Sequence, residues 1–151
     1  MAVKIIVKNR KAYHEYEVLE KVEAGISLVG TEVKSLRAGK INLGDGYCHI
    51  TRDYKLELRD VHISHWDFGN IQNHDPMRAR SLLMHKREII RLYSKIKEKG
   101  LTLIPLSLYF KRNWIKVEIG LCRGKKLHDK RQTLKEKDAK REIDRLKKGD
   151  F

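Results

Sequence analysis

The sequence has little cysteine and no long apolar segment. Its two cysteines, Cys48 and Cys122, stand 74 positions apart, with no CxxC pair and no histidine at zinc-finger spacing. We therefore predict no disulfide framework and no zinc module, and we expect both cysteines to be small buried residues. No run of about 18 apolar residues occurs, and the broken apolar run within residues 1–11 is too short for a signal sequence. We expect a soluble, cytosolic protein.

Motifs for catalysis are also scarce. Gly25–Gly30 has the glycine spacing of a phosphate-binding loop, but Thr31–Glu32 follows where such a loop places lysine and serine or threonine. His62 and His65 would point to opposite faces of a strand, which disfavours a shared metal. We therefore predict no enzyme, no cofactor and no metal site. The alternative is a nuclease or RNA-modifying enzyme that uses histidine and aspartate near the C-terminal end.

Positive charge is abundant. The chain has 34 Lys+Arg against 20 Asp+Glu, a net charge of +14, and a pI near 9.8. This balance favours a polyanionic partner such as a nucleic acid, although a generically basic soluble protein is the alternative. Positions 1–122 carry +8 and positions 123–151 carry +6. Both parts are expected to bind RNA with an affinity that falls as salt rises.

Apolar periodicity predicts a mainly β body. Alternation and turn residues predict a strand at 16–22, a hairpin within 46–65 and a second hairpin with strands at 101–110 and 114–122. Helical spacing predicts a short helix within 25–40 and a longer one within 78–100. Pro105 cannot donate to a ladder, so its strand is expected to be an edge or to carry a bulge. Short antiparallel strands with embedded helices indicate a small closed β-barrel.

The last 29 residues differ from the rest. Residues 123–151 contain 12 Lys+Arg and 6 Asp+Glu with few apolar positions, so we divide the chain into a barrel at 1–122 and a basic tail at 123–151. Thr133 and Glu136 match a capping box, and Gly149 supplies a stop. We expect the tail to be disordered or partly helical when free and to fold on a partner.

Basic residues and aromatic rings occur together at two places. Lys8–Lys11 precedes Tyr16, and Tyr109 and Trp114 flank the basic turn of the second hairpin. Cations on phosphates and rings on unstacked bases are the usual means of binding single-stranded or looped RNA. The alternative is that these rings pack in the core while the cations only keep the surface hydrated. Both interpretations stay open for each ring.

Several segments resemble one known family, the SmpB proteins, which are the tmRNA-binding (SsrA-binding) proteins of bacterial trans-translation. The match runs in order over nearly the whole chain, and its segments are NRKAYHEY (9–16), EAG (23–25), EVKSLRAGK (32–40), DP (75–76), LSLY (106–109) and KVEIGLCRGKKLHDKR (116–131). The most specific of them are EVKSLRAGK and the segment that ends in GKKLHDKR.

The resemblance implies a fold and a role. The fold is an OB-like β-barrel with embedded helices that binds the tRNA-like domain of tmRNA as a monomer, one-to-one. The complex enters ribosomes stalled on messages without a stop codon, so that nascent chains are tagged for degradation. The barrel takes the place of an anticodon arm, and the tail reads the empty decoding centre, formed by small-subunit rRNA, and the mRNA channel. The implied partners are tmRNA and the ribosome, with no membrane.

The resemblance also implies site residues by position. The implied tmRNA-binding residues are Asn9, Arg10, Lys11, Glu23, Leu83 and Lys116. The implied ribosome-binding residues of the tail are Gly124, Lys125, Lys126, His128, Asp129, Lys130 and Arg131. Glu23 suits base N–H donors and the cations suit phosphates, whereas Leu83 also fits a core position. His128 could stack on a decoding-centre base, with a solvated charge run as the alternative. Beyond Arg131 only the capping-box and charge pattern supports a role. A general single-strand-binding OB protein is a further alternative.

Overall fold

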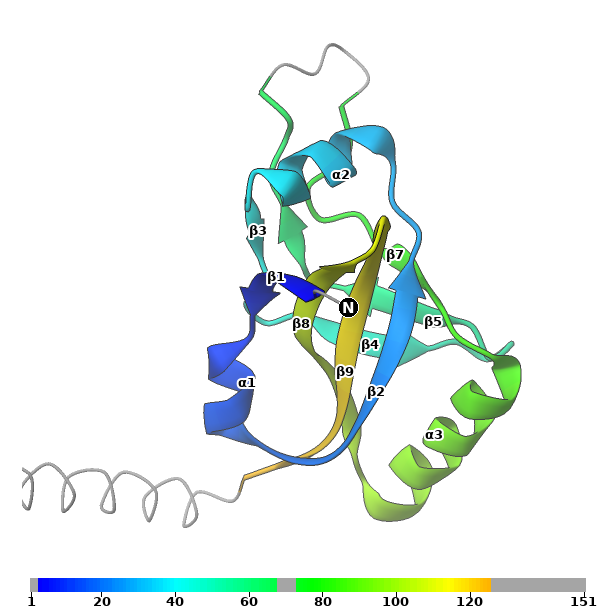
Figure 1. Cartoon of the computed structure of the whole chain (residues 1–151). Coiled ribbons are helices and arrows are strands. Elements are labelled where there is room, and N and C mark those ends of the chain that lie inside the picture. Colours follow the sequence, from blue (N-terminus) through cyan, green and yellow to red (C-terminus); the bar gives the residue numbers. More distant parts are fainter. Residues whose placement is uncertain (1–2, 68–72, 126–151) are drawn as a thin grey trace, which may run out of the picture.

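Antiparallel strands form the body of the protein (Figure 1). The computed structural model describes residues 3–67 and 73–125. Within these ranges the elements are β1 (Val3–Lys8), α1 (Arg10–Glu15), β2 (Tyr16–Ile26), α2 (Gly30–Arg37), β3 (Ile41–Asn42), β4 (Tyr47–Ile50), β5 (Leu56–Arg59), β6 (His62–Ile63), β7 (Arg80–Leu83), α3 (Lys86–Lys99), β8 (Thr102–Lys111) and β9 (Trp114–Gly124). None of the helices in this part of the chain is long and apolar enough to cross a membrane.

The main sheet closes into a ring. Its strand order is β8-β4-β5-β7-β2-β9, and β9 pairs back onto β8, while β1 adds to the free part of β8. The predicted hairpins β4–β5 and β8–β9 are both present and antiparallel. Closure removes the open edges that a six-stranded sheet would otherwise expose. The closed β-barrel predicted from the sequence is confirmed, and its helices sit around the ring.

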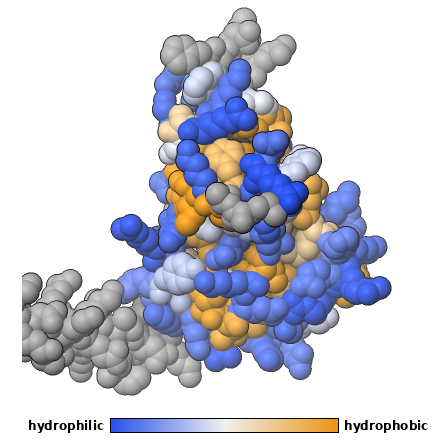
Figure 2. All heavy atoms as spheres, in the orientation of Figure 1, coloured by the Kyte–Doolittle hydropathy of each residue, from blue (hydrophilic) through white to orange (hydrophobic). Residues whose placement is uncertain are grey.

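The core fills the inside of the ring. Alternate residues of β9 point inward, and Val117, Ile119 and Leu121 are each at most 2% exposed. Cys48 and Cys122 are buried free thiols, as predicted. On the outside, hydrophilic side chains dominate the face in Figure 2, with apolar residues visible between them. The period-2 pattern of the sequence therefore separates core from surface.

The prediction of one helix over residues 78–100 is wrong at its start. Residues 80–83 form strand β7, and α3 begins only at Lys86. The leucine pair at 82–83 recurs as Ile89 and Ile90, which mimics helical spacing. β7 instead obtains its hydrogen bonds from β5 and β2, which lie far away in sequence. Tertiary pairing thus overrides a local helical pattern.

The structure extends or decides the prediction at three further places. β1 and α1 were not predicted, because Lys4 interrupts the apolar run and α1 has only six residues. Pro105 lies at a bulge in the β8–β9 pairing, which confirms one of the two predicted alternatives. The other alternative, an edge strand, is wrong, because β8 has neighbours on both sides. β9 continues to Gly124, so residues 123 and 124 still pair with β2 instead of leaving the barrel.

A buried ion pair joins α2 to the barrel. Glu32 and Arg80 have side chains with 0% exposure, and Arg80 Nε donates to Glu32 Oε2 at 2.6 Å. Arg80 also donates to the carbonyl oxygen of Val61 at 2.6 Å. Glu32 in turn accepts from the backbone N–H of Val29 at 3.0 Å, at the start of the helix. α2 spans Gly30–Arg37 and thus lies within the range 25–40 in which a short helix was predicted.

Candidate RNA-binding surface

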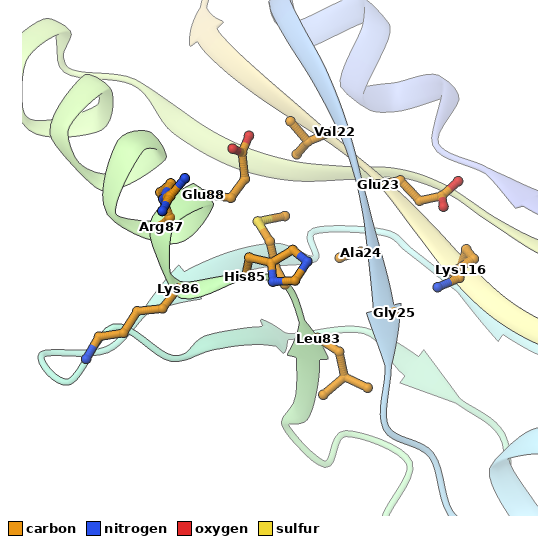
Figure 3. Close-up of a pocket in the computed structure, with 11 residues that line it drawn as sticks. Val22, Glu23, Ala24, Gly25, Leu83, His85, Lys86, Arg87, Glu88 and Lys116 are labelled. Atoms are coloured by element: carbon orange, nitrogen blue, oxygen red, sulfur yellow. The ribbon is translucent and has the colours of Figure 1, made fainter.

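An open groove of about 1030 Å³ brings together three of the predicted tmRNA-binding residues (Figure 3). Glu23 comes from β2, Leu83 from β7 and Lys116 from β9, while residues around the start of α3 form the opposite wall. In Figure 3, Glu23 and Lys116 lie on the same side of β2, and His85 approaches β2 from the α3 side. Residues separated by up to 93 positions therefore meet on one surface.

Strand register explains this convergence. Gly25 of β2 lies directly opposite Lys116 of β9 and also directly opposite Leu83 of β7. Directly opposite residues in antiparallel strands point to the same face, and so do residues two apart on one strand. Glu23 therefore shares the outer face with Lys116 and Leu83. A slip of one residue in β9 would turn Lys116 into the core.

Glu23 is held as an ionised acceptor. The hydroxyl group of Tyr109 donates to Glu23 Oε2, and Lys111 Nζ lies 3.5 Å from both carboxylate oxygens. The hydrogen bond from Tyr109 is the main cause that lowers the pKa of Glu23 below its usual value, with Lys111 and Lys116 adding to it. Glu23 also lines the groove, and a carboxylate has lone pairs beyond those that these two donors use. They suit N–H donors on the edge of a base.

We expect Tyr109→Phe to raise the pKa of Glu23 toward its ordinary value of 4.5, because the substitution removes the donor but keeps the ring that fills the site. A site-resolved NMR titration of the Glu23 carboxyl carbon measures this pKa. The carboxylate of the variant would accept a proton earlier as pH falls, so RNA binding through Glu23 would be lost at a higher pH than in the original chain. An unchanged pKa would show that Tyr109 does not hold the carboxylate.

Leu83 is not a core residue. Its side chain is 61% exposed, and it belongs to β7 instead of the predicted helix. A Cβ built on Gly25 would lie 3.3 Å from Leu83 Cβ, so the absence of a side chain at Gly25 lets Leu83 lie flat over β2. The core alternative for Leu83 is therefore wrong, and its place in the groove leaves it available to a ligand.

A basic run, His85–Arg87, also lines the groove and was not among the predicted RNA-binding residues. These residues lie at the start of α3 and line the groove, where the partial positive charge of the helix N-terminus adds to their own charge. α3 is fixed to β2 because Arg91 and Lys95 both bind Glu20, at 2.6 and 3.0 Å. The hydrogen bond from Arg91 is the main cause that lowers the pKa of Glu20 to about 2. If the helix had been predicted to begin at Lys86, these residues would have been recognised as a basic cluster at a helix N-terminus.

The other predicted tmRNA-binding residues lie apart from the groove, at the start of α1. Asn9 is 5% exposed and caps α1, since its Oδ1 accepts from the Ala12 N–H and its Nδ2 donates to the Pro105 carbonyl oxygen at 2.9 Å. Arg10 is exposed, and Lys11 pairs with Asp45 at 2.6 Å beside a separate pocket of about 390 Å³. Asn9 thus fixes the start of the helix that carries the two cations, and all three residues stay predicted RNA contacts.

The predicted rings divide between core and surface. Tyr109 is 8% exposed, whereas Trp114 is 70% exposed at the end of the β8–β9 hairpin. Tyr16 is half-buried and packs against the smaller core cluster. The interpretation of a buried ring therefore holds for Tyr109, although it lies on the outer face of the sheet opposite Lys116, and is wrong for Trp114.

Only the first residues of the predicted ribosome-binding segment are described. Gly124 closes β9 opposite Tyr16. The backbone N–H of Lys125 donates to the Glu15 carbonyl oxygen at 3.0 Å, which ties this residue to α1. The other predicted residues of the tail lie outside the described residues: Lys126, His128, Asp129, Lys130 and Arg131.

Comparisons with known proteins agree on one family. The family model for SmpB protein matches residues 6–149. An SsrA-binding protein of Carboxydothermus hydrogenoformans is 57% identical over 94% of this chain and 95% of the relative, and one of Syntrophotalea carbinolica is 56% identical over 96% of each. A chain in a solved structure described as "tmRNA-SmpB: a journey to the center of the bacterial ribosome" is similar with a TM-score of 0.67 and 49% identity, over 80% of this chain and 85% of that one.

Proposed function

The chain belongs to the SmpB family, and we propose on this premise that it is an RNA-binding adaptor of trans-translation that binds the tRNA-like domain of tmRNA through the outer face of its barrel. The observation that carries this proposal is the groove in which Glu23, Leu83 and Lys116 meet. The names of the relatives, which are SsrA-binding proteins, support the identity of the RNA.

The groove offers two kinds of contact. Lys116 and the basic run His85–Arg87 suit phosphates, which fix position and orientation on the RNA. Glu23 and Leu83 suit the edge and the face of an unstacked base, because a carboxylate accepts N–H donors and a leucine side chain packs on a flat apolar ring. A folded RNA with an exposed loop satisfies both. The role is binding and positioning, without bond making or breaking.

The ribosomal part of the proposal concerns the tail. The complex enters ribosomes stalled on messages without a stop codon, as one protein to one tmRNA. The barrel takes the place of an anticodon arm, so that nascent chains are tagged for degradation. The tail residues that contact small-subunit rRNA at the empty decoding centre are Gly124, Lys125, Lys126, His128, Asp129, Lys130 and Arg131. The tail's excess of positive charge supports its contact with rRNA.

Binding of the full chain to the tRNA-like domain, measured by fluorescence titration at several salt concentrations, tests the groove. Lys116→Ala is expected to weaken binding roughly 10-fold, as for the loss of one charge-assisted hydrogen bond, and to lower the salt dependence by about one counterion. Lys55→Ala removes an equal charge from the exposed β4–β5 turn and is the matched control.

Competition with an unstructured RNA of equal length completes the test. The proposal predicts strong preference for the tRNA-like domain and a loss of that preference in Glu23→Gln, which keeps the shape of the side chain but removes its charge. Equal affinity for both RNAs would instead identify a general single-strand binder.

A further inference from the structure

The groove is one end of a longer outer face that crosses five strands. Leu83, Gly25, Lys116, Tyr109 and Ile5 lie directly opposite one another in successive strand pairs, from β7 through β2, β9 and β8 to β1. Directly opposite residues share a face of the sheet. The row therefore runs from the groove to the free edge of β1 without leaving the outer surface.

A second row lies beside the first. Trp114, Lys111 and Val3 lie directly opposite one another on β9, β8 and β1. Trp114 and Lys116 are two residues apart on β9, so their side chains point to the same side of the sheet. Lys111 links the second row to the groove, because it lies opposite Trp114 and also contacts Glu23 of the groove.

Large apolar groups are exposed on this part of the face. Trp114 is 70% exposed, and Ile5 and Val3 are 49% and 48% exposed. Single exposed apolar residues are common, but three on adjacent rows, one of them a tryptophan, mark a contact surface. Lys111 lies between Trp114 and Val3 in the second row, and Lys116 of the groove is two residues from Trp114 on β9, so the surface alternates apolar groups and cations.

We propose that this face, Val3, Ile5, Lys111 and Trp114, is a second part of the RNA site, on which Trp114 stacks against an unstacked base while Lys111 contacts a neighbouring phosphate. A ring flanked by cations is the arrangement that binds looped RNA, and the surface is continuous with the groove. The inference rests on the proposed function and extends it, because it assigns RNA contacts to residues outside the groove. A protein partner on the same apolar surface is the competing occupant.

The test compares the RNA affinity of full-length variants for the tRNA-like domain. Trp114→Ala is expected to weaken binding roughly 10-fold or more, since it removes one stacked base. Trp114→Phe keeps a stacking ring and should stay within about threefold of the original chain. Met77→Ala removes an apolar side chain of 49% exposure from the loop before β7 and should leave the affinity unchanged. Trp114 lies outside the core, so thermal unfolding of Trp114→Ala should match that of the original chain.

A second readout reports contact directly. In a Trp66→Phe background Trp114 is the remaining tryptophan. Stacking predicts that its fluorescence is quenched with one-to-one stoichiometry as RNA is added, and that the bound RNA protects it from iodide.

Unchanged RNA affinity in Trp114→Ala, or full access of iodide in the complex, would overturn the inference. If that variant instead lost ribosome association with its RNA affinity intact, the face would be a protein contact. The proposed function fails separately, when the original chain does not prefer the tRNA-like domain or Lys116→Ala binds it normally.

Discussion

A chain that ends at Lys125 is expected to bind tmRNA with nearly full affinity and to support no tagging of stalled nascent chains. The truncation leaves β9 complete and keeps the hydrogen bond between Lys125 and Glu15, so the barrel and its groove are retained. It removes Lys126–Phe151, which includes five of the residues proposed to contact the ribosome. Affinity for tmRNA is measured by titration, and tagging is measured in a reconstituted translation reaction on a message without a stop codon.

The cut after Lys125 matters for this experiment. A deletion that begins at residue 123 would remove paired residues of β9 and could weaken the barrel itself. The matched control is a chain in which residues 126–151 are permuted, which keeps length and charge but not order. The proposal predicts that the permuted tail fails to restore tagging and that His128→Ala alone lowers it. Full tagging by the truncated chain would show that the division of roles between barrel and tail is wrong.

Arg80→Met is expected to lower the free energy of unfolding by about 3–5 kcal/mol, the usual cost of removing one partner of a buried ion pair. The substitution leaves the carboxylate of Glu32, which is 0% exposed, with one fewer donor, and it also leaves the Val61 carbonyl oxygen without its donor from Arg80. Burial raises the pKa of Glu32, but the hydrogen bonds from Arg78, the Val29 N–H and Arg80 outweigh it and hold this pKa below its usual value.

Arg78→Met supplies the matched control. Arg78 contacts the same carboxylate, but its side chain is 37% exposed, so we expect a loss of about 1 kcal/mol. Urea unfolding of both variants at neutral pH measures the difference. Because the pKa of Glu32 is lowered in the folded state, its pairing stabilises the fold above the ordinary carboxyl pKa and ceases to do so as pH falls through the lowered one. Equal losses from the two substitutions would contradict the assigned role of burial.

Local sequence patterns predicted the elements that carry their own signal. β9 alternates apolar and polar residues, and β8 is a nearly continuous apolar run on the other side of a basic turn, so the hairpin follows from local pattern alone. β7 was mistaken for helix because its leucines match helical spacing with α3, and only its partners on β5 and β2 decide the outcome. The burial of Arg80 could not be foreseen either, since its partner Glu32 is 48 positions away.

The candidate site shows the same limit. The resemblance named Glu23, Leu83 and Lys116, but their meeting depends on the registers of β2 with β7 and with β9, which single-sequence patterns do not give. Asn9 was named as an RNA contact, and only tertiary structure shows that its side chain caps α1 and binds the backbone of β8. The exposure of Trp114 likewise depends on its position at the end of a hairpin, and not on its neighbours in sequence.

A chemical footprint of the full chain on tmRNA tests the central claim, that the outer face of the barrel binds the tRNA-like domain, most directly. The account predicts protection confined to that domain in the chain that ends at Lys125, and loss of this protection in Lys116→Ala but not in Lys55→Ala. Two results would contradict the account. One is protection spread along the whole RNA, and the other is protection of the tRNA-like domain that requires residues 126–151 and is unchanged in Lys116→Ala.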